Sequence, residues 1–308
     1  VVNLFEPGVG VNLHTTEHAQ EFVGKQQTLS EILIHIFPQS FIEAAAHGEV
    51  LQIVVFTIIF SFGLALVPKE KRDTMLSFCD SLAEVMFKFT GIVMKLAPIG
   101  VGAALAVTVG HRGLSVLVNL GLAISSFYVA LIFFLVGILG TVALVARIPI
   151  RKFLRAVKEP ALIAFSTTSS EAALPKAMQA MEEFGIPRRI VAFVMPTGYS
   201  FNLDGSTLYL SLAAVFIAQA AGVELSFGQQ LLMMLTLMLT SKGVAGVPRA
   251  SLVILAGTVA SFGLPLEGVA ILLGIDEIMD MGRTTVNVVG NCLATAVVAR
   301  CEGELKPA

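Results

Sequence analysis

The sequence predicts an all-α integral membrane protein with inverted repeats and two re-entrant helical hairpins. Of its 308 residues, 56% are hydrophobic and only 14% are charged, whereas a soluble domain carries roughly 25% charged residues. The segment between Arg112 and Arg147 has no charged side chain, and about 20 apolar residues suffice to cross a bilayer. Two later apolar segments, at about 150–187 and 225–266, are each interrupted by a short polar tip.

The first third of the chain predicts a loop followed by membrane helices. Residues 1–28 have the composition of the end of a truncated hydrophobic helix and a polar loop, and an amphipathic piece follows at 29–37. Two apolar segments predict spans at about 50–67 and 85–109. Basic residues are enriched in cytoplasmic loops, which places the connection between these spans inside the cell because it contains Lys69, Lys71 and Arg72.

The first predicted hairpin follows a long helix over 113–146. Two basic groups mark the two ends of the hairpin, and both are expected in the cytoplasm: Arg147, Arg151, Lys152, Arg155 and Lys158 at its start, Arg188 and Arg189 just after it. The apolar chain at about 150–187 then enters and leaves the membrane on one side, with its Ser-rich tip lining protein or water. An amphipathic hairpin on the membrane surface is the alternative interpretation.

The rest of the chain repeats this pattern in the opposite orientation. A helix at about 190–222 leads outside, and a second hairpin at about 225–266 has a tip too rich in Gly and Pro for a continuous helix. A last helix at about 268–300 returns the C-terminus to the cytoplasm. Broken hydrophobic segments at matching places in two halves are typical of the central site of a transporter.

The last helix carries a polar stripe inside an apolar sequence. Its members are spaced by three or four residues and so share one helix face: Asp276, Asp280, Arg283, Thr284, Asn287 and Asn291. Ionisable residues at membrane depth are functional candidates because they are costly to bury. An ion pair between Asp280 and Arg283 that only joins helices is the alternative.

The preceding helix contains Asn202-Leu203-Asp204-Gly205 in its middle. Gly and Asn here predict a helix that is unwound at mid-membrane, with free carbonyls and one carboxylate. A set of oxygen ligands of this kind suits a hard cation such as sodium.

Four motifs follow one another along the chain: SSEAALP (169–175), NLDGSTLY (202–209), SKGVAGVP (241–248) and DEIMDMGRTTVNVVGN (276–291). In this order they resemble the dicarboxylate/amino acid:cation symporter family, the glutamate transporters, over nearly the whole chain. Inverted repeats are a property of this family, so the repeat is not independent of the resemblance.

The resemblance implies a glutamate-transporter-like fold in the inner (plasma) membrane and a homotrimer with elevator-type alternating access. Residues 1–28 would then be the end of a helix and a loop, 29–111 scaffold helices and 112–308 the transport domain. The expected partners are an acidic amino acid and the lipid bilayer, with no nucleic acid, no enzymatic activity and no cofactor.

By the same resemblance, Arg283 is expected to bind the side-chain carboxylate of L-glutamate or L-aspartate, which a planar guanidinium fork suits. Asp280 is expected to bind the α-amino group. Further substrate contacts are expected from Thr284, Asn287 and Ser206, and from the hairpin tips at Ser169, Ser170 and Val247. The cation-binding set comprises Asn202, Asp204, Asn287, Asn291 and the backbone at Gly198 and Ser200, with sodium as the only metal considered.

Three positions differ from the sodium-driven members of the family. Asn291 stands where they have Asp, Lys242 places a fixed ammonium group in the second tip, and Glu171 replaces Ser in the first tip. These differences resemble the bacterial proton-coupled branch, closest to its glutamate/aspartate symporters, and favour a co-transported proton over sodium, with Glu171 as its carrier. Arg249 stands where relatives have Gly, and either balances Asp280 and the substrate or only solvates the tip.

Two other functions are alternatives to amino-acid symport. A C4-dicarboxylate symporter would bind no amino group, and its branch lacks an aspartate at the Asp280 position. An intramembrane aspartyl protease with Asp204 and Asp280 as its dyad needs two carboxylates that share one proton. Arg283, one turn from Asp280, opposes that arrangement because it keeps the carboxylate ionised.

Overall fold

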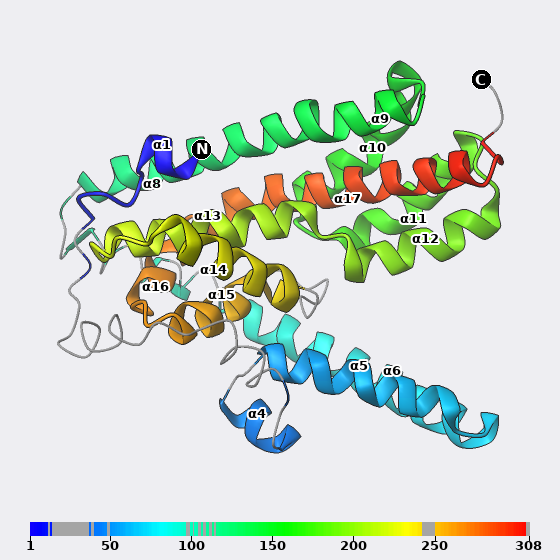
Figure 1. The fold of residues 1–308 in the computed structure, drawn as a ribbon, viewed down its shortest axis with the longest axis horizontal. Coiled ribbons are helices and arrows are strands. Elements are labelled where there is room, and N and C mark those ends of the chain that lie inside the picture. Colours follow the sequence, from blue (N-terminus) through cyan, green and yellow to red (C-terminus); the bar gives the residue numbers. More distant parts are fainter. Residues whose placement is uncertain are drawn as a thin grey trace.

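The computed structural model is almost entirely helical. It describes residues 1–11, 13, 37, 40–47, 50–96, 99–100, 102–103, 106, 109–110, 113, 115–241 and 250–305. Figure 1 shows α17 (Asp276–Cys301) running lengthwise through the larger part of the molecule, with other helices around it. The predicted amphipathic piece at 29–37 and the tip of the second hairpin lie almost wholly outside the described residues.

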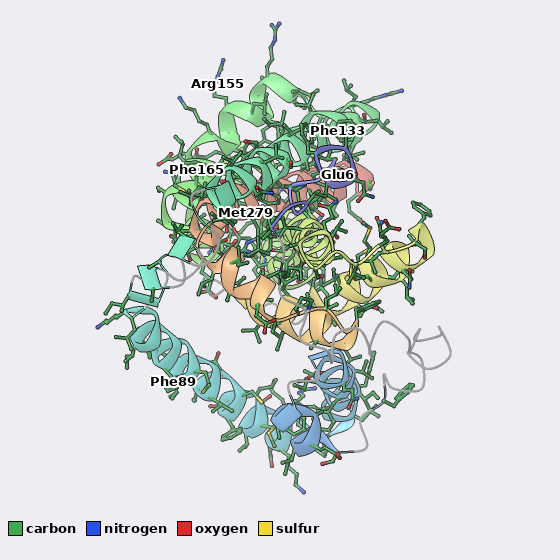
Figure 2. All side chains as sticks on the ribbon, turned by 90° about the vertical axis from the view of Figure 1, so that its left-hand side faces the viewer. Glu6, Phe89, Phe133, Arg155, Phe165 and Met279 are labelled. Carbon is green, nitrogen blue, oxygen red and sulfur yellow. The ribbon has the colours of Figure 1, made fainter. Side chains whose placement is uncertain are left out.

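Near the N-terminus, α1 (Val2–Phe5) packs on the main body, whereas α4 (Phe41–His47), α5 (Val50–Leu66) and α6 (Lys69–Met94) lie apart from its centre (Figures 1 and 2). Helix α5 confirms the helix predicted at about 50–67. The basic segment after it is the first turn of α6 and not a loop. Pro68 favours this start because its fixed φ suits the position just before or within a first turn, and its carbonyl accepts the Arg72 N–H at 3.0 Å.

A long helical segment forms most of the uncharged stretch between Arg112 and Arg147. It comprises α8 (Ser115–Phe133), the π-helical turn η1 (Phe134–Leu139) and α9 (Gly140–Val145). Two segments among the described residues, Val116–Val145 and Arg188–Ala220, have the length and composition to cross a membrane. Only 11% of the most apolar part of the first segment is buried within the protein, which agrees with a surface that faces lipid.

The predicted first hairpin is a pair of helices, α10 (Ile150–Thr167) and α11 (Ser170–Glu183), packed against each other and against α17. Thr168 turns the chain with φ 50°, in the left-handed region. Ser169 then caps α11, since its side chain accepts the Ala172 N–H at 3.2 Å. The left-handed backbone at Thr168 and the cap at Ser169 together account for the sharp turn in the Ser-rich sequence.

The helix predicted at about 190–222 is broken where expected. It consists of α12 (Arg188–Phe201) and α13 (Asp204–Ala220), with Asn202 and Leu203 outside helical geometry between them. The second hairpin contributes α14 (Phe227–Thr240) and α15 (Ala250–Ser261), which pack against each other.

The expectation of one last helix over 268–300 is wrong. The segment is divided into α16 (Glu267–Leu273) and α17, and the break falls at Gly274 and Ile275. Glycine has a low helix propensity, and the break makes Asp276 the first residue of α17, where a carboxylate interacts favourably with the helix dipole.

Helix α17 lies between two apolar clusters. One cluster is built mainly on α8, α13, α15 and α16, and the other on α10, α11, α12 and the C-terminal half of α17. In Figure 2, Met279 of α17 lies inside the main body, whereas Phe89 of α6 lies well away from it. The side chains of the polar stripe on α17 are buried within the protein.

Candidate functional site

The centre of the site is a buried guanidinium group between two carboxylates. Arg283 and Asp280 form a two-pronged ion pair, with Nε 2.9 Å from Oδ1 and Nη2 2.8 Å from Oδ2. Arg283 Nη1 lies 3.7 Å from Oδ1 of Asp276. The Arg283 side chain is 3% exposed and those of Asp276 and Asp280 are 0% and 4% exposed, so these three charges are held almost free of water.

An aromatic ring from a second helix completes this cluster. The guanidinium carbon of Arg283 lies 4.5 Å from the ring centroid of Tyr209, which α13 contributes and which is fully buried. A cation over an aromatic face is stabilised electrostatically, most strongly where water is excluded. The sequence predicts no role for Tyr209, although it lies within one of the four motifs.

Polar groups beside Arg283 join α17 to the broken helix. Thr284 donates its hydroxyl hydrogen to Asp280 Oδ1 at 2.7 Å. The Asn287 side chain accepts the backbone N–H groups of Gly205 at 2.8 Å and Ser206 at 3.3 Å, and donates to Ser206 Oγ at 3.0 Å. Leu203, the N-cap of α13, makes no side-chain cap hydrogen bond. Asn287 therefore satisfies helix-end donors that would otherwise be buried without a partner.

Oxygen atoms gather around the break between α12 and α13. The Asn202 carbonyl accepts Asn291 Nδ2 at 3.4 Å, and the buried Asn291 Oδ1 accepts no hydrogen bond within the described part of the chain. A Cβ atom on Gly290 would overlap the Asp204 carboxylate, and one on Gly198 would overlap Asn291 Oδ1. A carboxylate, an amide oxygen and backbone carbonyls form the kind of donor set that hard cations prefer.

Close backbone contact at Gly205 gives a testable consequence. A Cβ at this position would lie 2.9 Å from the Arg283 carbonyl carbon and closer still to its oxygen, which are backbone atoms that cannot turn aside. We expect Gly205→Ala to lower the stability by about 1–3 kcal/mol, the usual cost of overpacking. The measurement is the midpoint of thermal unfolding of the purified protein in detergent.

Gly228→Ala is the matched control for this substitution. Gly228 lies inside α14, and a methyl group added to its Cα would have nothing within 4 Å, so alanine there should be neutral or slightly stabilising. Equal unfolding midpoints for the two variants would contradict the tight fit of α13 on α17.

The start of α10 lies beside the C-terminal end of α17. Arg300 Nη2 donates to the Arg147 carbonyl at 2.8 Å, just before α10 begins. Helix α10, which is 18 residues long, packs against α17. Arg283 lies 18 residues before Cys301, the last residue of α17. Because both helices rise about 1.5 Å per residue, we expect Ser169 and Ser170 to lie near the depth of Arg283. Glu171, in the first turn of α11, is exposed.

The structure thus brings together most of the residues predicted for the site. Asp280, Arg283 and Thr284 form one hydrogen-bonded group, and Asn287 and Ser206 form a second one beside it on the same helix face. Asn202, Asp204, Gly198 and Asn291 surround the helix break. For Ser200 only the helical backbone is described. Lys242, Val247 and Arg249 lie outside the described residues, so their roles stay predictions.

Comparison with known proteins identifies the family of this chain. The family described as "Sodium:dicarboxylate symporter family" matches residues 1–301. The "Proton/sodium-glutamate symport protein" of Bacillus subtilis is 44% identical over 315 residues, covering 100% of this chain and 73% of that protein. The "Proton/glutamate-aspartate symporter" of Escherichia coli is 42% identical, covering 98% and 71%. The "C4-dicarboxylate transport protein" of Rhizobium etli is also 42% identical, covering 99% and 70%.

Proposed function

Because the chain belongs to the sodium:dicarboxylate symporter family, we propose that it is a secondary active symporter of L-glutamate and L-aspartate. A proton, in preference to sodium, drives uptake across the plasma membrane. The family consists of transporters, so the aspartyl-protease alternative is wrong. The bidentate pairing of Asp280 with Arg283 is also unsuited to a dyad that shares a proton.

The buried pair of Asp280 and Arg283 is the observation that carries this proposal. An amino acid with an acidic side chain offers both an ammonium and a carboxylate group for exchange. Its carboxylate can replace Asp280 on the guanidinium, while its ammonium replaces Arg283 on Asp280. Neither buried charge is then left unpaired, which matters because breaking a buried pair by removing one partner is strongly destabilising.

A C4-dicarboxylate is the second candidate substrate, since a relative of similar identity carries that name and Arg283 suits any carboxylate. A dicarboxylate that displaced Asp280 from Arg283 would leave the Asp280 carboxylate without a cation. Uptake of labelled aspartate and succinate into proteoliposomes, with proton and sodium gradients imposed separately, tests the choice. Uptake of succinate alone would refute the amino-acid assignment.

We assign cation binding to the helix break. Asp204, Asn202 and Asn291 supply side-chain oxygens there, and Gly198 and Ser200 supply backbone carbonyls. The amide of Asn291 brings no negative charge, so the sodium affinity of this set is expected to be lower than that of a set with two carboxylates. This expectation agrees with a proton as the main coupling ion and is tested by the sodium dependence of the same uptake assay.

Replacement of Glu171 tests the proton coupling. In Glu171→Gln, substrate binding should persist while accumulation driven by a pH gradient is lost, because the amide cannot carry a proton. The measurements are aspartate binding to the purified protein and uptake with an imposed pH gradient in sodium-free buffer. Glu182→Gln, on the same helix and also exposed, is the control and should behave like the parent protein. Full pH-driven accumulation by Glu171→Gln would exclude this residue as the proton carrier.

The domain organisation follows the same proposal. Residues 112–308 would move as a transport domain against scaffold helices in residues 29–111, with hairpins at about 150–187 and 225–266 entering the membrane as re-entrant loops. The apolar side chains exposed on α5 and α6, among them Phe62 and Phe89, suit contact with lipid or with two further copies in a homotrimer. Chemical cross-linking in membranes tests the trimer, and dimers as the largest product would contradict it.

A further inference from the structure

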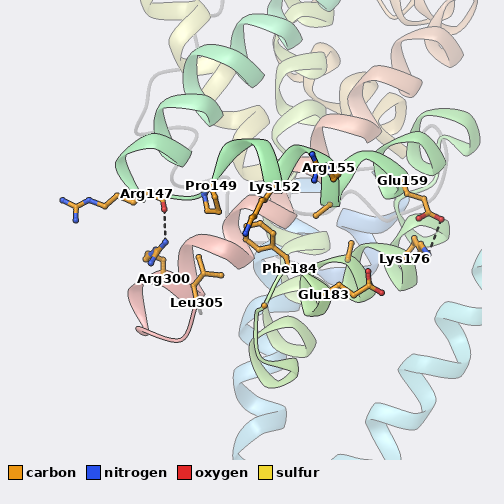
Figure 3. Close-up of a pocket in the computed structure, with 13 residues that line it drawn as sticks. Arg147, Pro149, Lys152, Arg155, Glu159, Lys176, Glu183, Phe184, Arg300 and Leu305 are labelled. Carbon is orange, nitrogen blue, oxygen red and sulfur yellow. Dashed lines mark hydrogen bonds and ion pairs between the residues drawn. The ribbon is translucent and has the colours of Figure 1, made fainter. Parts of the chain in front are cut away.

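A basic groove lies far from the buried site, at the end of the long apolar helix. It has a volume of about 820 Å³ and forms where α9 leads into α10, beside the C-terminal ends of α11 and α17 (Figure 3). Five of the side chains that line it are basic and two are acidic. The groove therefore has an excess of positive charge that three separate parts of the fold create together.

Much of this charge is not neutralised within the protein. Lys176 Nζ lies 3.3 Å from Glu159 Oε1, so these two charges balance each other. In the described part of the chain, no carboxylate lies within ion-pair distance of Lys152 or Arg155. Lys152 extends from α10 into the groove (Figure 3). An anion bound in the groove could therefore pair with Lys152 and Arg155 without displacing a carboxylate of the protein.

The start of α10 adds backbone donors to these cations. Pro149, which lines the groove, is the N-cap of this 18-residue helix and makes no side-chain cap hydrogen bond. The first N–H groups of a helix have no partner within the helix, and the positive end of the helix dipole attracts phosphate groups. The backbone donors and the basic side chains thus favour the same kind of ligand.

The groove also adjoins the lipid-facing surface. The apolar segment Val116–Val145 ends two residues before Arg147, and Leu144 and Val145 are 66% and 79% exposed. A lipid with acyl chains along α9 would bring its headgroup to the start of α10. Free phosphate offers the same anionic chemistry but would make no use of this apolar surface.

We propose that the groove binds the phosphate-bearing headgroup of an anionic phospholipid. Lys152, Arg155 and the N-terminus of α10 hold the phosphate, and the apolar surface of α9 holds the acyl chains. The proposal needs only a chain that spans a membrane and is independent of which substrate the protein carries.

Native mass spectrometry of the purified full chain with phosphatidylglycerol and phosphatidylcholine tests this site. Lys152→Gln/Arg155→Gln should bind phosphatidylglycerol about 25-fold more weakly than the parent protein, from roughly fivefold per basic residue near an anionic headgroup. Binding of phosphatidylcholine, whose headgroup has no net charge, should change less. The charge-preserving variant Lys152→Arg/Arg155→Lys should retain the preference for phosphatidylglycerol.

Arg151→Gln/Lys158→Gln is the matched control, since it removes the same charge from exposed positions of α10 that do not line the groove. It should bind phosphatidylglycerol like the parent protein. Equal losses in the groove and control variants would overturn the proposal, as would equal binding of the two lipids by the parent. Stabilisation by inorganic phosphate that needs Lys152 and Arg155, without preferential phosphatidylglycerol binding, would overturn the lipid assignment.

Discussion

Replacing Arg283 with alanine is expected to abolish uptake of acidic amino acids, with a loss of at least about 100-fold. The substitution removes the guanidinium group that contacts both Asp276 and Asp280, and leaving a buried charge without its partner costs about 3–5 kcal/mol. The substrate carboxylate loses the same partner. Uptake and equilibrium binding of labelled glutamate measure the effect.

A second variant separates lost binding from lost folding. Arg283→Ala/Asp280→Asn removes the opposing charges together, so its unfolding temperature should recover part of the loss while glutamate uptake stays absent. Arg283→Lys keeps the charge but loses the planar fork, and is expected to fold with reduced affinity. Undiminished glutamate uptake by Arg283→Ala would refute the assignment of the substrate carboxylate to this residue.

Asp280→Asn is expected to weaken aspartate binding far more than succinate binding. A hydrogen bond to a charged group contributes about 1.5–3 kcal/mol, which corresponds to a loss of about 10- to 150-fold for a ligand that carries an ammonium group. Succinate has no such group, so its affinity should fall little or even rise as Arg283 becomes free. Competition of both ligands against labelled aspartate provides the two affinities.

Asp276→Asn is the matched control for this variant. Asp276 lies on the same helix and faces the same guanidinium at 3.7 Å, but it only positions Arg283 in the proposed site. Replacement of Asp276 should weaken the binding of aspartate and of succinate by similar factors. If Asp280→Asn also weakened both ligands equally, Asp280 would be a structural partner of Arg283 and the amino-acid assignment would lose its support.

Several features of this protein could be predicted from the sequence because they depend on local composition or spacing. The uncharged stretch before Arg147 requires an apolar environment, whichever helices it contacts. The spacing of Asp280, Arg283 and Asn287 places them on one helix face by helix geometry alone. The break at Asn202 and the turn at Thr168 and Ser169 follow from residues that favour unwound or capped backbone.

Other features were decided only by the way in which the helices pack. The helix break at Gly274 was missed because an isolated glycine is tolerated in many helices, and here the break makes Asp276 the first residue of α17. Tyr209 lies under the guanidinium only because α13 packs on α17.

The groove at the start of α10 likewise needs three parts of the chain to meet. Arg300 and Lys152 are far apart in the sequence, and only the antiparallel packing of α10 along α17 brings them to one end of the molecule. Periodicity determines which face of a helix is polar, but it contains no information about which helix that face will meet. Contacts between helices depend on side-chain shape across the interface, and for this reason the tertiary structure alone decided them.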